Sequence, residues 1–189
     1  MQRTENDLQH NVKGLEIVAA ILRESLKADS LNVLLDRTLT LILSRDTLVL
    51  EKKGAIFLTD AGSLVMASQQ GMEPALQEHS HHVAMSHCLH DQMERLVYVA
   101  DLDTYHELLP SEMKAQGHYC LPLQTEDELL GILTLYLPPH HHQEWIEEHF
   151  MIMVADTLAL IIRHARAAEA LRHARDDLKR LVALRTVEL

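Results

Sequence analysis

Two short pairs of cysteine and histidine are the residues with the clearest capacity for chemistry in this chain. Cys88 and His90 stand two positions apart in the stretch HCLH. His118 and Cys120 have the same spacing in the stretch GHYC. Thiolate and imidazole groups bind zinc and iron, and side chains two apart on a strand emerge on the same face. The sequence therefore predicts one four-coordinate metal site, whose ligands are Cys88, His90, His118 and Cys120.

Other interpretations of these residues stay open. Cysteine is among the most buried residue types, so Cys120 could belong to the core. Cys88 and Cys120 could also form a redox pair without a metal. His106 is a further candidate, either as an additional ligand or as a partner that orients one. The chain holds 14 histidines, and the triple histidine at 140–142 predicts adventitious metal binding only.

Several functional classes have little support. The chain lacks a Gly-rich phosphate loop, a Gly-x-Ser-x-Gly elbow and a His-Glu-x-x-His motif, so we expect no enzyme. A formal charge of -11 opposes binding to nucleic-acid phosphates, and 4% aromatic residues disfavours base stacking. No apolar run is long enough to span a bilayer and no signal peptide opens the chain, which predicts a cytoplasmic location.

The elements at the two ends of the chain carry heptad stripes. The N-terminal helix has apolar residues at alternating spacings of four and three, and the helix predicted from about residue 143 to residue 189 has the same pattern. Because a single striped helix would expose its stripe to water, we expect a homodimer. The predicted interface consists of Leu8, Val12, Leu15, Ala19, Leu22, Leu26, Leu171, Leu178 and Leu181.

Between these ends the sequence is rich in strands. Asp29 and Ser30 offer N-caps for a second helix. Strands are then predicted at 54–59, 64–69, 96–100, 118–123 and 129–137, with a polar helix at 74–93 and a loop at 101–117. This order predicts an α+β fold, in which helices pack on an antiparallel sheet and long helices flank it at both termini.

Three stretches of this middle region resemble the GAF domain, a small-molecule sensing fold of bacterial signalling proteins. They are GAIFLTDAGSLVMASQQG at 54–71, VYVADL at 97–102 and LPLQTEDELLGILTLYL at 121–137. The resemblance implies a sensory domain at 30–163, after a coiled-coil helix at 1–29. It also implies a signalling helix at 164–189, which would lead to an output domain absent from this chain, such as a histidine kinase, a PAS domain or a cyclase.

One subset of GAF domains adds a Cys-x-Cys, an Asp-x-x-His-Glu and a Gly-His-Tyr-Cys motif. This chain matches them with Cys88, with Asp103 and His106, and with 117–120, but it has His90 where a second cysteine is expected. The resemblance implies a sensor of gas (nitric oxide or oxygen) or redox state, with iron favoured over zinc. Haem or no cofactor at all are alternatives. A metal-free pocket for a ligand of the cyclic-nucleotide type and a pure dimerisation module are the rival functions.

Overall fold

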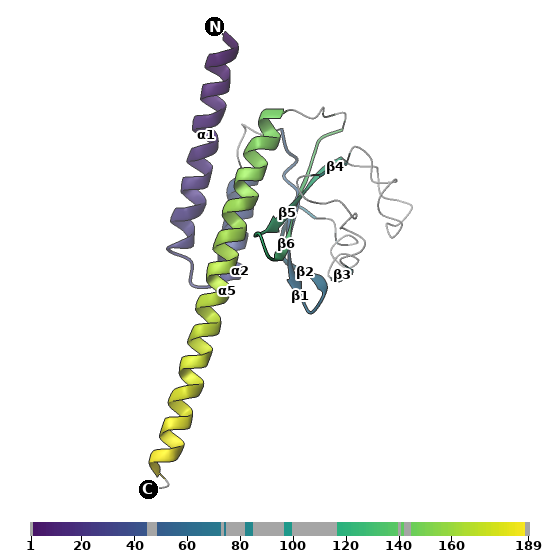
Figure 1. The fold of residues 1–189 in the computed structure, drawn as a ribbon. Coiled ribbons are helices and arrows are strands. Elements are labelled where there is room, and N and C mark those ends of the chain that lie inside the picture. Colours follow the sequence, from purple (N-terminus) through teal and green to yellow (C-terminus); the bar gives the residue numbers. More distant parts are fainter. Residues whose placement is uncertain are drawn as a thin grey trace.

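The computed structural model describes residues 2–44, 49–72, 74, 82–84, 97–99, 117–139, 141 and 145–187. Helices α1 (Gln2–Ser25) and α2 (Leu31–Leu43) come first. Six strands follow, which are β1 (Gly54–Asp60), β2 (Ser63–Gln70), β3 (His82–Ala84), β4 (Val97–Val99), β5 (His118–Gln124) and β6 (Leu129–Tyr136). The long helix α5 (Trp145–Val187) comes last (Figure 1).

The strands form one antiparallel sheet in the order β3-β2-β1-β6-β5-β4. The β1–β2 hairpin turns at Ala61 and Gly62, whose φ angles of 46° and 84° are both positive. Two positive φ angles are the geometry of the tight turn that matches the twist of paired strands. The expected α+β fold with an antiparallel sheet is confirmed.

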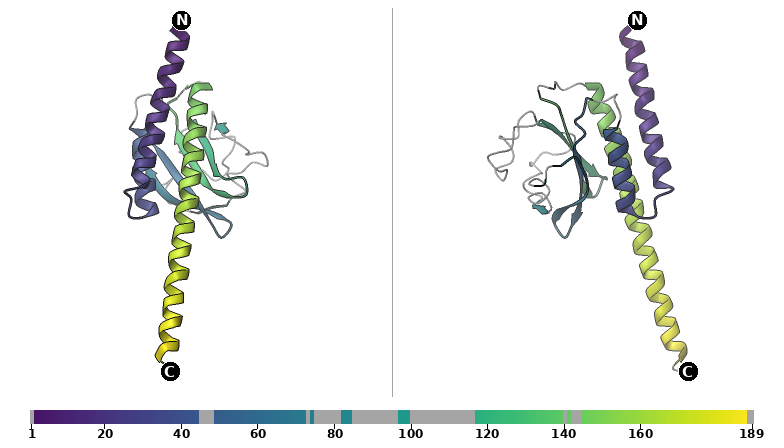
Figure 2. Two further views of the ribbon diagram at one scale, coloured as in Figure 1. Left: turned by 60° about the vertical axis from the view of Figure 1, so that its left-hand side comes forward. Right: turned by 180° about the vertical axis from the view of Figure 1, so that it is seen from behind.

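The described helices α1, α2 and α5 all lie on the same side of this sheet (Figures 1 and 2). Alternate residues of the strands, such as Tyr119 and Leu121 of β5, pack into one apolar core with helical residues. The helical contributions include Ile17 and Ile21 of α1, Leu35 and Leu39 of α2, and Val154, Leu158 and Ile162 of α5. Helix α2 starts at the expected cap, because the Ser30 side chain accepts a hydrogen bond from the Val33 amide at 3.4 Å.

Helices α1 and α5 run side by side in the same direction (Figure 2). A Cβ at Gly14 of α1 would meet the Phe150 ring of α5 at 2.9 Å, so the absence of a side chain there allows close packing. Further along, Leu22 of α1 and Leu160 of α5 line the same groove. Beyond that groove α5 continues alone, away from the sheet (Figure 1). Within the described residues, no helix has the length and apolarity that a bilayer crossing requires.

Arg166 is the point at which α5 is fastened to the strands before it leaves the sheet. Its Nη2 donates to the Thr59 carbonyl at 2.8 Å, and its Nη1 donates to the Thr59 hydroxyl at 3.3 Å. The same Nη1 lies 3.9 Å from the Glu128 carboxylate in the β5–β6 turn. One side chain therefore links α5 to two hairpin ends.

Replacing Arg166 by methionine is expected to lower the free energy of unfolding by about 1 kcal/mol, because hydrogen bonds from a charged, partly exposed donor are lost. Urea titration followed by circular dichroism measures this change. Arg163→Met is the matched control, since Arg163 is exposed about one turn earlier on the same helix. Equal midpoints for the two variants would show that the Arg166 link does not stabilise the fold.

The predicted elements agree with the observed ones except in the segment 74–93, where a polar helix was expected. The structure places strand β3 at residues 82–84, paired with β2 from Ser63↔Ala84 to Val65↔His82. The helix prediction is therefore wrong at these three residues. Most of the remaining segment, and the loop predicted at 101–117 apart from residue 117, lie outside the described residues.

Candidate functional site

His118 and Cys120 lie on the sheet face opposite the helices, which we call the distal face. Their neighbours Tyr119 and Leu121 enter the helix-covered core, and side chains alternate between faces along a strand. His118 is 1% exposed and Cys120 is 9% exposed, so both are buried. Their spacing along β5 corresponds to about 6.5 to 7 Å. The structure thus brings this pair of predicted ligands to one buried surface.

His118 belongs to a row of polar side chains across three neighbouring segments. It is paired with Tyr136 of β6, and the two rings lie 5.7 Å apart between centroids. On the other side of Tyr136 lies Lys53, the residue directly before β1. Its carbonyl accepts a hydrogen bond from the Tyr136 amide at 3.1 Å. The Lys53 Nζ lies 4.6 Å from the centre of the Tyr136 ring, within cation–π distance.

Cys120 belongs to the next row of the distal face. Its partner on β6 is Thr134, and Ala55 of β1 pairs with Thr134 from the other side. The Cys120 Sγ lies 3.8 Å from the Thr134 Oγ1. A third row, of Pro122, Ile132 and Phe57, is apolar. Across the distal face, the first row is therefore charged and aromatic, the second holds a thiol and a hydroxyl, and the third is purely apolar.

Lys53 and Tyr136 were not among the predicted site residues. Lysine is among the residue types least often buried, and Lys53 is only 7% exposed. A signal for Tyr136 and Thr134 is present in the sequence, because they alternate with leucines in LTLYL at 133–137. No such signal marks Lys53, whose position beside Tyr136 follows from strand pairing.

The other predicted ligands, Cys88, His90 and His106, lie outside the described residues. Among the residues that are described, no group of three or more metal-binding side chains comes together. Of the predicted ligands, His118 and Cys120 have described positions, and they share one face of β5. The complete four-ligand set stays a prediction.

A second surface of interest lies on the helices. On α1, the buried residues Gly14, Ile17 and Ile21 share one side. Another side of α1 is apolar and exposed, and so is part of α5, with exposed fractions from 46% to 88%. We call these residues the exposed seam. It consists of Val12, Leu15 and Leu22 of α1, Leu26 directly after α1, and Leu160, Leu171, Leu178 and Leu181 of α5.

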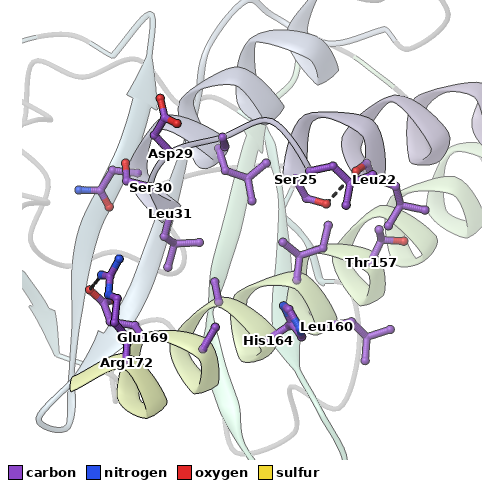
Figure 3. A pocket seen from close by; sticks show the side chains of 17 residues that line it. Leu22, Ser25, Asp29, Ser30, Leu31, Thr157, Leu160, His164, Glu169 and Arg172 are labelled. Carbon is purple, nitrogen blue, oxygen red and sulfur yellow. Dashed lines mark hydrogen bonds and ion pairs between the residues drawn. The ribbon is translucent and has the colours of Figure 1, made fainter. Parts of the chain in front are cut away.

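Eight of the nine predicted interface positions have described side chains. Seven are members of the exposed seam, and Ala19 lies on the same side of α1 and is half-buried. The ninth, Leu8, has a backbone in α1, but its side chain lies outside the described set. The two helical parts of the seam meet at a groove of about 910 Å³, lined by Leu22 and Leu26 on one side and by Leu160 and His164 on the other (Figure 3). The homodimer itself stays a prediction.

Solved structures with a similar fold come from several kinds of protein. The GAF domain of a phosphoenolpyruvate-protein phosphotransferase from Coxiella burnetii is 27% identical, with a TM-score of 0.65 over 83% of this chain and 96% of that one. The GAF domain of a putative sensor histidine kinase from Pseudomonas syringae pv. tomato is 16% identical, with a TM-score of 0.63 over 89% and 99%.

An enzyme also shares the fold. The free methionine-R-sulfoxide reductase from Neisseria meningitidis is 16% identical, with a TM-score of 0.63 over 82% of this chain and 91% of that one. The architecture therefore serves both regulatory domains and enzymes. No curated protein matches the chain in sequence.

The family model for the GAF domain matches residues 13–162. This range includes the second half of α1, the sheet and the α5 residues that enter the core. This match, over a sheet with the strand order described above, shows that the chain belongs to the GAF domain family.

Proposed function

We propose that this GAF domain is the sensory module of a bacterial signalling protein, with a metal ion as its receptor. The ligands in this proposal are Cys88, His90, His118 and Cys120, with His106 as an additional ligand or an orienting partner. Two copies joined through α1 and α5 would pass the response to an output domain. The module would regulate rather than catalyse.

One observation carries the metal proposal. His118 and Cys120 share the distal face, two positions apart on β5, and both are buried. An imidazole and a thiol are a donor pair that suits zinc and iron, and burial excludes competing water. Thr134, beside Cys120, would fix the orientation of the sulfur through the contact at 3.8 Å. The donors that the structure describes thus fit such an ion.

Iron is favoured over zinc because a sensor needs a centre that changes state. Bound iron would supply redox states and open positions for a small gas, whereas zinc has neither redox chemistry nor, in a closed structural site, a free position. The chain's own residues would hold the ion and shield it. Domains of two putative sensor histidine kinases share this fold, which supports the sensory role.

The first test is metal analysis of protein purified without an affinity tag, so that added histidines do not contribute. We expect a stoichiometric amount of iron, with thiolate-to-metal absorption that appears on oxidation and changes when nitric oxide is added. Zinc in place of iron would support a structural site and refute the sensing role. Protein without any bound metal after anaerobic purification and reconstitution would refute the metal proposal.

A metal-free receptor for a small anion is the second candidate, and the row Lys53, Tyr136 and His118 favours it. An ammonium, a phenol and an imidazole on one buried surface are donors for a phosphate or a carboxylate. A ligand of the cyclic-nucleotide type has this chemistry. Isothermal titration of metal-free protein with cyclic nucleotides distinguishes this candidate from the first, because Lys53→Met would abolish anion binding without removing a metal ligand.

A further inference from the structure

Strand β4 lies beside the two described candidate ligands. It consists of Val97–Val99, and it stands at the end of the described strand order, where it pairs with β5. In this pairing Val97 is opposite Cys120, and Val99 is opposite His118. The strand β4 is therefore hydrogen-bonded to the same stretch of β5 that carries this histidine and this cysteine.

Tyr98 stands between these two positions and enters the opposite face of the sheet. Its partner on β5 is Tyr119, and the two rings lie 5.6 Å apart between centroids, inclined by 53°. Both rings pack in the core that the helices share with the sheet. Because side chains alternate between faces along a strand, Tyr98 lies directly behind the pair His118 and Cys120.

The Tyr98 hydroxyl reaches the connection between β6 and α5. It donates a partly buried hydrogen bond to the His141 carbonyl at 2.8 Å. His141 closes a turn, since its amide donates to the Pro138 carbonyl at 3.2 Å, and α5 begins shortly afterwards at Trp145. One hydrogen bond thus connects the strand beside the candidate ligands to the segment that leads into α5.

A metal ion at the proposed site would hold β4 against β5. Two predicted ligands, Cys88 and His90, precede β4 in the sequence, and His106 follows it. The other two, His118 and Cys120, stand on β5. A three-residue strand at the end of a sheet has few ladder hydrogen bonds, so its local opening requires less free energy than global unfolding. An ion bound to these ligands would tie the chain around β4 to β5 and oppose this opening.

We propose that the Tyr98 hydroxyl is the contact through which metal binding stabilises the start of α5. The ion restrains β4, β4 positions Tyr98, and Tyr98 holds the His141 carbonyl in the connection that precedes the helix. The inference rests on the metal of the proposed function and does not require the dimer. Because coupling between two sites is reciprocal, the same hydrogen bond also raises the affinity for the ion.

Hydrogen exchange followed by mass spectrometry measures the stability of the first turns of α5 in metal-free protein and in protein loaded anaerobically with ferrous iron. In the wild type we expect iron to slow this exchange by about 3- to 10-fold, the factor to which one hydrogen bond corresponds. Tyr98→Phe removes the hydroxyl and keeps the ring beside Tyr119. This variant should bind iron in the same stoichiometry, but iron should no longer slow exchange in α5.

Thr157→Val is the matched control. It also removes a partly buried hydroxyl, but the Thr157 Oγ1 donates to the Met153 carbonyl at 2.7 Å within α5 itself. The control should therefore keep the wild-type response to iron. If Tyr98 had a purely structural role, Tyr98→Phe would speed exchange equally with and without iron, and the slowing by iron would persist. The ratio of the two exchange rates therefore separates a link to the metal from a contribution to stability.

Three results would count against this link. A Tyr98→Phe variant that keeps the wild-type response refutes the role of this hydroxyl. Iron that binds to the wild type without slowing exchange in α5 refutes any coupling between the site and the start of the helix. Both results leave the metal of the proposed function in place, whereas wild-type protein that binds no iron refutes the iron centre and this inference together.

Discussion

Replacing Leu15 and Leu178 by glutamate should abolish the proposed dimer and leave a folded monomer. Both residues belong to the exposed seam, with exposed fractions of 58% and 61%. Burying a leucine contributes about 1.5 to 3 kcal/mol, and the double variant would remove four such leucines from the dimer and insert four like charges. We expect the dissociation constant to rise by at least about 100-fold, which corresponds to about 2.7 kcal/mol.

Light scattering measures this change, and circular dichroism should report an unchanged sheet because neither leucine is part of the core. His173→Glu is the matched control for Leu178→Glu. It places the same charge on the same helix, five residues away and about 140° around its axis, so the dimer should persist. A double variant that remains dimeric would show that the copies associate through another surface.

Replacing Cys120 by serine should release most of the bound metal. Serine keeps the size and the hydrogen-bonding capacity of cysteine beside Thr134, but it does not supply a thiolate ligand. We expect the variant to fold, because Cys120 faces the distal surface rather than the core between sheet and helices. Metal content after dialysis against a weak chelator is the measurement.

Two variants control for indirect effects. Thr134→Val changes the neighbour of Cys120 without removing a ligand, so it should lower the metal content much less. His141→Ala removes a histidine of the 140–142 run, and it should change only loosely bound metal. Equal metal content in wild type and the Cys120→Ser variant would mean that Cys120 is not a ligand. Its remaining interpretations would then be a redox pair with Cys88 or a plain buried residue.

The regular parts of the fold follow from local patterns in the sequence. The strands β1, β2, β5 and β6 were predicted because each is a mainly apolar run bounded by turn residues, even though Pro122 stands in β5 and Gly131 in β6. Helix α2 was predicted from its Ser30 cap. Strand β3 was missed, since three residues hold no pattern of their own and their extended form depends on pairing with β2.

For helix α1, the sequence pattern did not identify the side that enters the core. Its exposed stripe at Leu15 and Leu22 has clear heptad spacing, whereas the stripe that actually enters the core, at Ile17 and Ile21, was not singled out. A helix with two apolar sides does not reveal from its sequence which side faces its own domain. The burial of Lys53 was missed for a related reason, because only the pairing of β1 with β6 brings it over Tyr136.

Helix α5 is uninterrupted from Trp145 to Val187, and Arg166 fastens it to the strands partway along. A helix of 43 residues transmits direction as well as position over about 65 Å. Inserting one residue after Arg166 would turn everything downstream by about 100° about the axis, whereas inserting seven would leave the angle nearly unchanged. The orientation of any protein joined to this helix would therefore depend on the linker length. In a series of fusions whose linkers differ by single residues, the activity of the fused protein should rise and fall with the helical repeat.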